Sequence, residues 1–385
     1  MKKIIYLFLL TAFIYLVSPF GGTLFYIHGI RWVYVLLISS MATYLLMPPA
    51  ISIGHRAGLL DHPDEERKIH KIPIPTTGGI AVFIAFFLTL TRNLNMSTQV
   101  KGILLAVLLI FISCILDDIF KLSATLRLLI QIAATTILIV FGIRVTVIPN
   151  GFFLKDALDI GITYFGVLGI TNAFNYMDGM NGEAAGLAIV SGLSLFFIAL
   201  SNGARQISWL AIGLVGCCLG FLPYNFPRAK VFLGDNGSNI IGFLLAAIAI
   251  AGSWSAVNPA VAVATPLLIF SIYIFDMTYT TVSRIKNGSV RNLRQWFAVT
   301  GKDHFHHRLV NLGFAETHSV IIIWGCAAIF SFSAFVIRKA SWLNASLIML
   351  QCMFIYFLIV VLMLAGREKY AEMRVDISEK KGEIT

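Results

Sequence analysis

The acidic residues carry the clearest chemical signal in this chain of 385 residues. Of 19 Asp and Glu, none lies at the middle of a long apolar run. Five lie where such runs end or turn: Asp117, Asp118, Asp178, Asp235 and Asp276. Carboxylates beside apolar segments are costly unless they are paired or functional. We therefore expect these five to contribute to one site that handles cations or phosphate groups.

Asp117 and Asp118 end the first of these runs, in the segment ILDDIFKLS. Consecutive positions of a helix point about 100° apart, so the two carboxylates should face different partners. One can take a metal ion or a proton while the other orients it. Lys121 shares a face with Asp117, so an ordinary ion pair at a helix end explains this segment equally well.

A second segment, NAFNYMDGMNGEAAG, joins two apolar runs. Asn172 and Asn175 lie one helical turn apart, where unpaired amides in lipid would be costly. The dipeptides that begin at Asp178 and Asn181 each end in glycine and predict a turn, whose backbone N–H groups can approach a ligand. A capping turn is the structural alternative, but the asparagines favour a functional site.

A third segment, PYNFPRAKVFLGDNGSNIIG, contains a tight turn around Asp235 that begins a helix. Such a turn suits an anion or a metal-bound phosphate. Phe232, just before it, offers a flat face on which a base could stack, although a single Phe also fits a lipid contact.

A fourth segment, GKDHFHHRL, carries His304, His306 and His307. The short spacing and the lack of nearby cysteine argue against a zinc cluster. Hydrogen bonding to a diphosphate or a sugar is the favoured interpretation, and a solvated polar loop is the alternative.

The elements that position these residues are predicted to be membrane helices. The chain is 58% hydrophobic and 12% charged, so its solvent must be lipid. Since a span needs about 20 apolar residues, we expect an all-α polytopic integral membrane protein, a bundle of about 11–12 transmembrane helices with cytoplasmic active-site loops. The candidate spans are 4–26, 33–54, 75–91, 102–116, 124–142, 160–177, 184–200, 207–222, 239–254, 259–276, 318–337 and 342–365.

The basic residues predict the orientation. With the N-terminus inside, 21 Lys and Arg lie in the cytoplasmic segments and 8 on the opposite face, as the positive-inside rule requires. The formal net charge of +10 therefore reflects membrane orientation, and we expect no nucleic-acid partner. A transporter would need polar residues at the midplane, which the sequence does not show.

The same pattern divides the chain. We expect a transmembrane domain at 1–366, with an extra N-terminal helix at 1–30, a cytoplasmic substrate loop at 277–317, and a charged cytoplasmic tail at 367–385. Lys2 and Lys3 before an apolar run also resemble a signal peptide, but Ser18-Pro19-Phe20-Gly21-Gly22 is a poor cleavage site.

Taken in order, these segments resemble the polyprenyl-phosphate N-acetylhexosamine-1-phosphate transferase family. The loop GLLDHPDEERKIHKIPIPTTGG is similar to a further family motif, and the matching motifs run from Gly58 to Leu309. The run H-F-H-H-R-L resembles the undecaprenyl-phosphate N-acetylglucosaminyl-1-phosphate branch. Asn181 departs from the family pattern, which often has an aspartate at that position.

The resemblance implies a reaction at the cytoplasmic face of the bacterial inner membrane. N-acetylglucosamine 1-phosphate would pass from UDP-GlcNAc to undecaprenyl phosphate, giving undecaprenyl-diphospho-GlcNAc and UMP, the first membrane step of a cell-envelope glycopolymer. The alternative donors are another UDP-N-acetylhexosamine or UDP-MurNAc-pentapeptide. Mg²⁺ is the expected cofactor, with Mn²⁺ as a substitute, and a homodimer is a further expectation.

The resemblance also implies roles for individual residues. Asp235 would bind the metal with support from Asp118, while Asp117, Asp118 and Asp178 would be catalytic. The substrate-binding residues would be Lys121, Asn172, Asn175, Asn181, Asn225, Phe232, Arg67, Lys68, His304, His306, His307 and Arg308.

Overall fold

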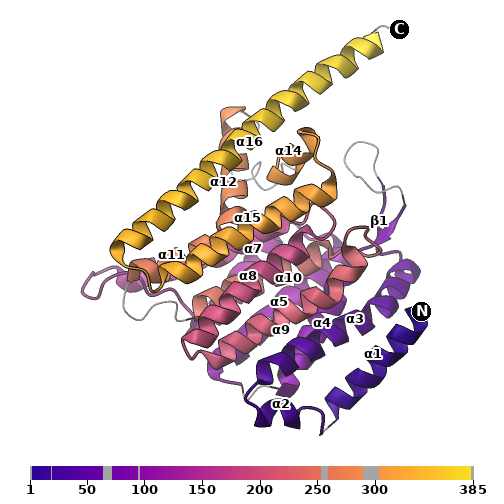
Figure 1. The fold of residues 1–385 in the computed structure, drawn as a ribbon, viewed down its shortest axis with the longest axis vertical. Coiled ribbons are helices and arrows are strands. Elements are labelled where there is room, and N and C mark those ends of the chain that lie inside the picture. The colour runs from indigo at the N-terminus through magenta and orange to yellow at the C-terminus, as the bar shows by residue number, and fades with distance from the viewer. Residues whose placement is uncertain are drawn as a thin grey trace.

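The computed structural model describes residues 2–18, 20–63, 72–93, 96–252, 259–288 and 303–382. Within these ranges almost every element is a helix (Figure 1). The two strands found there, β1 (Leu60–Asp61) and β2 (Ile74–Pro75), form one short antiparallel pair. The predicted all-α fold of a polytopic membrane protein is therefore confirmed.

The described helices follow one another along the chain with short connections. In order they are α1 (Lys2–Val17), α2 (Thr23–Ile27), α3 (Arg31–Ala57), α4 (Gly78–Asn93), α5 (Thr98–Phe120), α6 (Ala124–Val140), α7 (Lys155–Tyr176), α8 (Glu183–Ser201), α9 (Arg205–Asn225), α10 (Gly234–Ala251), α11 (Pro259–Ile269), α12 (Ser271–Lys286), α14 (Phe305–Asn311), α15 (Glu316–Ile337) and α16 (Trp342–Gly382). The charged segment predicted as a tail from 367 onward continues α16 without a break.

Length and composition qualify many of these helices as membrane spans. Among the described residues, eight helices are long and apolar enough to cross a bilayer, and α11 with α12 passes the same test as a bent pair. Three shorter apolar helices coincide with α1, α4 and α6. Each of the twelve predicted segments therefore corresponds to an apolar helix or to this helix pair.

Two of the predicted spans are not continuous helices. The segment predicted as 4–26 separates into α1 and α2, because the chain turns after Val17 in a stretch rich in glycine. The segment predicted as 259–276 bends by 74° between α11 and α12. Pro266 lies within α11, and proline removes one backbone hydrogen bond of a helix.

Three helices form the centre of the bundle. In α9 and α10, 72% of the most apolar window is buried inside the protein, and in α8 61% is buried, whereas only 17% is buried in the last span. Figure 1 shows α16 along one side of the bundle and α1 at the other. The central helices α8 and α10 are also the ones that begin with Glu183 and with the Gly234–Ser238 turn.

Small residues let α9 approach α3 closely. A Cβ at Gly216 would lie 2.0 Å from the hydroxyl of Ser39, and one at Gly220 would lie 2.2 Å from the carbonyl oxygen of Ser40. These glycines share one face of α9, in the spacing that membrane helices use for close contact. Packing between backbones therefore fixes the rotation of α9.

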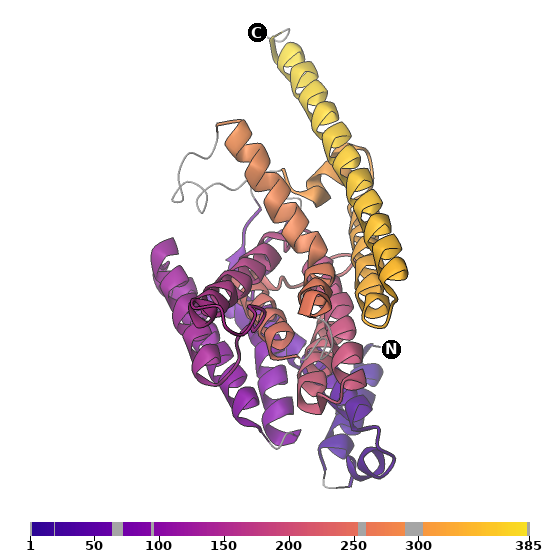
Figure 2. The ribbon, with the colours of Figure 1, turned by 90° about the vertical axis from the view of Figure 1, so that its left-hand side faces the viewer.

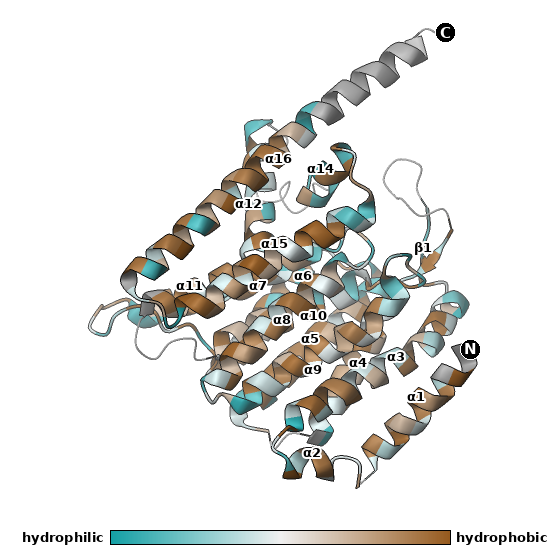
Figure 3. Cartoon of the chain, in the orientation of Figure 1, coloured by the Kyte–Doolittle hydropathy of each residue, from teal (hydrophilic) through white to brown (hydrophobic). Residues whose placement is uncertain are grey.

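Hydrophilic residues gather towards the helix ends, and hydrophobic residues run along the helices (Figure 3). Figure 2 shows α12 and α16 extending beyond the ends of the other helices, on the side where β1 and α14 also lie in Figure 1. The helices alternate in direction, so the loops after α3, α5, α7 and α9 all meet on this side. This arrangement brings the predicted site segments together.

Candidate active site

One large cavity opens among these helix ends. Its volume is about 1420 Å³. The walls come from five separate parts of the chain: 57–61 with Thr76, Asp118 with Lys121, residues 178–181, residues within 225–236, and residues within 307–317. Segments that lie far apart in the sequence therefore share one solvent-filled space.

Half of the predicted site residues line this cavity. They are Asp118, Lys121, Asp178, Asn181, Asn225, Phe232, Asp235 and His307. Six others lie around it without lining it: Asp117, Asn172, Asn175, His304, His306 and Arg308. Arg67 and Lys68 fall outside the described residues. Of the five aspartates predicted to share a site, Asp118, Asp178 and Asp235 do so.

The end of α5 points its two carboxylates in different directions, as the helical spacing predicts. Asp118 lines the cavity and accepts a hydrogen bond from the side-chain amide of Asn236. Asp117 instead pairs with Arg127, whose guanidinium lies 3.4 Å from its carboxylate. Lys121 ends the helix with a φ of 52°, the left-handed conformation of a helix C-cap, and also lines the cavity.

Asn172 and Asn175 attach α7 to its neighbours. The Asn172 amide donates to the side-chain oxygen of Gln131, 3.0 Å away, on α6. The Asn175 amide donates to the hydroxyl of Ser238, 2.6 Å away, on α10. These bonds satisfy the amides that would otherwise be costly in lipid. The two asparagines therefore hold α7, which precedes Asp178, against α6 and against the helix that carries Asp235. The predicted substrate contacts of both stay predictions.

Two hydrogen bonds of the Asn225 side chain hold the turn that follows α7. The side-chain oxygen of Asn225 accepts a hydrogen bond from the amide of Gly182 (2.6 Å), and its NH₂ group donates to the carbonyl oxygen of Val231 (2.9 Å). Gly182 has a φ of 81°, which favours glycine. This pairing joins the Asp178 turn to the segment before Asp235.

The carboxyl group of Asp178 has a raised pKa. Burial, with the nearby carboxylates of Asp235 and Glu183, raises the pKa of Asp178 to about 8. No described residue donates a hydrogen bond to the carboxylate of Asp178 or of Asp235. A pKa of about 8 leaves the Asp178 carboxyl largely protonated at pH 7, and a bound cation would favour its ionised form. Both carboxyl groups are therefore available to a cation.

The turn around Asp235 packs against Gly78 and Gly79, which end the loop GLLDHPDEERKIHKIPIPTTGG. The amides of Gly78 and Gly79 donate to the carbonyl oxygens of Phe232 and Leu233, at 3.0 and 2.9 Å. A Cβ at Gly79 would lie 2.3 Å from the amide nitrogen of Gly237. The glycines thus let α4 reach the first turn of α10, which leaves Asp235 exposed towards the cavity.

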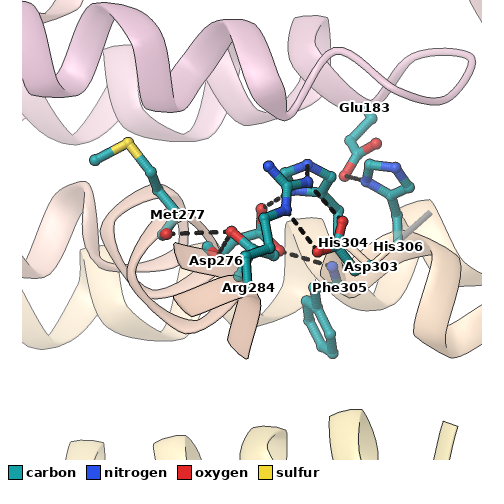
Figure 4. Close-up of polar contacts among 9 residues, drawn as sticks. Glu183, Asp276, Met277, Arg284, Asp303, His304, Phe305 and His306 are labelled. Carbon is teal, nitrogen blue, oxygen red and sulfur yellow. Dashed lines mark hydrogen bonds and ion pairs between the residues drawn. The ribbon is translucent and has the colours of Figure 1, made fainter. Parts of the chain in front are cut away.

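Hydrogen bonds to acidic side chains hold the histidine segment in place (Figure 4). One ring nitrogen of His304, Nδ1, lies 2.6 Å from the carboxylate of Asp276, which also accepts from the amide of Phe305. The Arg284 guanidinium binds both carboxylate oxygens of Asp303, at 2.7 and 2.6 Å. These contacts join the end of α12 to the start of α14, so the segment has a fixed base.

Protonation differs between the two buried histidines. Burial disfavours the charged ring of His304, but the Asp276 carboxylate outweighs this effect and raises the pKa of His304. Burial and the charge of His304 lower the pKa of His306 to about 4. At neutral pH we therefore expect a neutral His306, beside a His304 that is protonated more readily than an ordinary histidine. Arg284 holds the pKa of Asp303 below its usual range, although burial opposes this.

Sequence reasoning missed several residues of this region. Asn236 binds Asp118, Glu183 binds His306, and Arg127 binds Asp117. Glu183 had a readable signal, because a single Glu at the start of a long apolar run is costly unless it is paired. No sequence signal pointed to the contacts of Asn236 and Arg127, because these contacts depend on how separate helices cross.

Two of the cavity carboxylates would fit a Mg²⁺ ion. Among the described residues no three His, Cys, Asp or Glu side chains converge into a closed metal site. Mg²⁺ does not need one, because it prefers oxygen ligands and uses one or two carboxylates together with water and substrate phosphates. Asp235 and Asp118, which line the same cavity, fit this requirement.

Comparison with known proteins gives consistent matches. A model described as glycosyl transferase family 4 matches residues 100–253. A protein of Bacillus subtilis (strain 168), named "Probable undecaprenyl-phosphate N-acetylglucosaminyl 1-phosphate transferase", is 31% identical over 341 residues, covering 87% of this chain and 90% of that protein. A Mycobacterium tuberculosis (strain CDC 1551 / Oshkosh) protein named "Decaprenyl-phosphate N-acetylglucosaminephosphotransferase" is 32% identical over 335 residues, covering 77% and 80%.

A further relative is more distant but similar in extent. The undecaprenyl-phosphate alpha-N-acetylglucosaminyl 1-phosphate transferase of Escherichia coli (strain K12) is 27% identical over 310 residues, covering 74% of this chain and 78% of that protein. The family model spans the helices that carry Asp118, Asp178 and Asp235. The chain therefore belongs to glycosyl transferase family 4, in the branch of the undecaprenyl-phosphate N-acetylglucosaminyl 1-phosphate transferases.

Proposed function

We propose that this protein transfers N-acetylglucosamine 1-phosphate from UDP-GlcNAc to undecaprenyl phosphate, with Mg²⁺ as cofactor. The products are undecaprenyl-diphospho-GlcNAc and UMP, and the step begins a cell-envelope glycopolymer. The observation that carries the proposal is the single cavity in which Asp118, Asp178 and Asp235 meet Lys121 and His307. The names of the relatives support the acceptor and the sugar.

The reaction joins two anions. An oxygen of the acceptor phosphate attacks the phosphorus that carries GlcNAc, a new P–O bond forms, and the bond to UMP breaks. The second pKa of a phosphate monoester is about 6, so the acceptor is largely ionised at pH 7 without a strong base. The protein's main tasks are therefore to neutralise charge and to align the two phosphates.

The end of α5 is the proposed acceptor side. Lys121 lines the cavity and can bind the lipid phosphate. Asp118 is held in place by Asn236, so its carboxylate is oriented before substrate arrives. Asp235 and Asp118 would hold Mg²⁺, and the chemistry that the ion would supply there is neutralisation of the diphosphate charge and a better UMP leaving group.

Other residues of the cavity wall form the proposed donor side. Phe232 offers a face on which uracil can stack. Asn181 also lines the cavity, and its side-chain amide donates to the carbonyl oxygen of Pro227 at 3.3 Å. His307 lines the same space and can donate to the diphosphate. Asn225 acts indirectly, because its side chain is engaged in holding the Asp178 turn.

An assay of the purified protein tests the proposed reaction. UDP-GlcNAc, UDP-GalNAc, UDP-MurNAc-pentapeptide and UDP-glucose are each offered with undecaprenyl phosphate and Mg²⁺, and UMP release is measured. We expect turnover with UDP-GlcNAc to exceed that with each other donor and to stop when EDTA is added. Preferred turnover of another donor, or full activity in EDTA, would contradict the proposal.

His307→Ala should weaken donor binding. Its ring is the one histidine side chain of α14 that lines the cavity, and a hydrogen bond to a charged group is worth roughly 1.5–3 kcal/mol. The Kd for UDP-GlcNAc, measured by calorimetry, should therefore rise by about ten- to a hundredfold. His28→Ala, in the exposed turn before α3 at the other end of the bundle, is the control and should bind normally. An unchanged Kd in His307→Ala would remove this residue from the donor site.

The membrane orientation gives a further prediction. We propose that the cavity faces the cytoplasm of a bacterial cell, because 21 of the 29 Lys and Arg lie in segments predicted to be cytoplasmic, as the positive-inside rule requires. A cysteine placed at Asn287, after α12, should react with a membrane-impermeant maleimide only in inverted vesicles. A cysteine at Asn150, before α7, should react in intact cells. The reverse pattern would contradict the orientation.

A further inference from the structure

A buried acid–histidine pair lies behind the cavity wall and is unused by the reaction described above. The carboxylate of Glu183 and ring nitrogen Nδ1 of His306 are 3.1 Å apart. Glu183 is fully buried, and His306 is 1% exposed. Figure 4 shows the carboxylate at the start of α8 facing the ring on α14. The pair joins two elements that lie 123 residues apart in the sequence.

The opposite edge of the His306 ring supports the Asp178 turn. A Cβ added to Gly179 would lie 2.4 Å from both Cε1 and Nε2 of His306. The ring therefore lies against the backbone of the turn, and no larger side chain fits at position 179. Asp178, Gly179 and Met180 line the cavity on the other side of that contact. Any rotation of the ring would displace this turn.

His306 also supports the next residue, His307. The two rings meet edge to face with their centroids 4.4 Å apart, and only His307 of the two lines the cavity. On its other side His306 stacks on His304, with centroids 5.8 Å apart, and His304 is anchored to Asp276. The ring of His306 is thus enclosed, and the contact that sets its rotation is the one with Glu183.

A packing role alone does not account for Glu183. One of its carboxylate oxygens, Oε2, has no hydrogen-bond partner among the described residues. Burying a carboxylate with incomplete partners is costly, and an apolar side chain of similar volume is often as stable or more so. The interactions of Glu183 with His306 and with the backbone of Gly179 and Met180 are ones that an apolar residue could not supply. The bond to His306 acts on the ring. It selects which ring nitrogen carries the proton and so orients the ring.

We infer that Glu183 is a positioning residue, whose hydrogen bond to His306 holds the Asp178 turn and His307 in the geometry that binds the nucleotide-sugar donor. The inference rests on the proposed function, in which this wall is the donor side. Glu183 itself does not touch the cavity. Its effect should therefore reach the donor through His306 and leave the acceptor side, around Asp118 and Lys121, unchanged.

Glu183→Met tests this directly, because methionine is apolar and of similar length. The KM for UDP-GlcNAc should rise about tenfold or more, as expected when a buried polar group loses its hydrogen-bond partner. The KM for undecaprenyl phosphate should stay within about twofold of wild type. Ser191→Ala is the matched control: it removes a buried hydrogen bond of the same helix, to the hydroxyl of Tyr273 at 2.8 Å, away from the cavity. It should leave both KM values unchanged.

Two further variants test whether the effect of Glu183→Met comes from the lost hydrogen bond. Glu183→Gln retains an oxygen that can accept from Nδ1–H and should restore the donor KM to within about threefold of wild type. His306→Phe removes the same hydrogen bond from the other partner, and its effect combined with Glu183→Met should be less than additive. It also serves if Glu183→Met does not fold.

The possible outcomes separate the inference from the proposed function. Donor KM values in Glu183→Met equal to wild type, a Glu183→Gln as impaired as Glu183→Met, or strictly additive effects would each overturn the inference. An equal rise in the KM of both substrates would show a general loss of structure instead, which also overturns it. Failure of the wild-type protein to bind UDP-GlcNAc by calorimetry would reject the proposed function.

Discussion

Asp235→Asn is expected to lower the rate of UMP release by about 10²–10³-fold, the usual cost of removing one charge-stabilising group. Asp235 is exposed to the cavity in the first turn of α10. No described residue donates a hydrogen bond to its carboxylate, so the fold does not depend on its charge. Asparagine has the same shape but is a poor Mg²⁺ ligand. The variant should therefore fold normally and fail in catalysis.

The measurement is UMP release at saturating Mg²⁺ and saturating substrates, with the thermal midpoint in detergent as the check on folding. Asp156→Asn is the matched control, because Asp156 is also exposed in the first turn of a helix, α7, where it pairs with Arg144 at 3.1 Å. It lies away from the cavity and should retain full activity. If Asp235→Asn keeps more than a tenth of wild-type activity, Asp235 is not an essential ligand.

Asp118→Asn should suppress turnover by about a hundredfold while sparing donor binding. Asn236 donates a hydrogen bond to Asp118, and an asparagine at position 118 can still accept it. The local structure should therefore survive, while the charge that supports the metal and the acceptor phosphate is lost. Calorimetry with UDP-GlcNAc should give a Kd close to that of wild type, and UMP release should give the loss in rate.

Asp117→Asn is the informative comparison, since the neighbouring carboxylate has a different partner. It forms a partly exposed ion pair with Arg127, and such pairs contribute about 0–1 kcal/mol. We expect an activity loss of about fivefold or less. A larger loss in Asp117→Asn than in Asp118→Asn would show that the family role belongs to the first aspartate and that the cavity lining does not identify it.

The membrane fold was largely predictable from the sequence. Long apolar runs must become helices in lipid, because every backbone polar group has to be satisfied within the segment. Their positions follow from composition alone, whatever packs beside them. The breaks were harder to predict: α1 separates from α2, and α11 bends by 74° into α12. The first break lies in a stretch rich in glycine and the second within apolar sequence, and hydropathy alone revealed neither.

The chemical segments were also recognisable from residue type and spacing. Carboxylates and histidines at the ends of apolar runs had to lie at one side of the bundle, because successive spans alternate in direction. Eight of the predicted residues line one cavity there. The pairing of consecutive aspartates with different partners followed from the helical period. Sequence therefore determined which residues approach the site and from which loops.

Only the tertiary structure decided what each of these side chains faces. Asn175 turns to Ser238 on α10, His306 turns to Glu183, and Asn236 reaches Asp118 across 118 residues of chain. These contacts depend on the rotation of each helix and on how closely neighbouring backbones approach, which glycines such as Gly79 and Gly179 permit. A helical pattern specifies which residues share a face but not which neighbour that face meets. The division between residues that touch substrate and residues that hold them is therefore a property of packing.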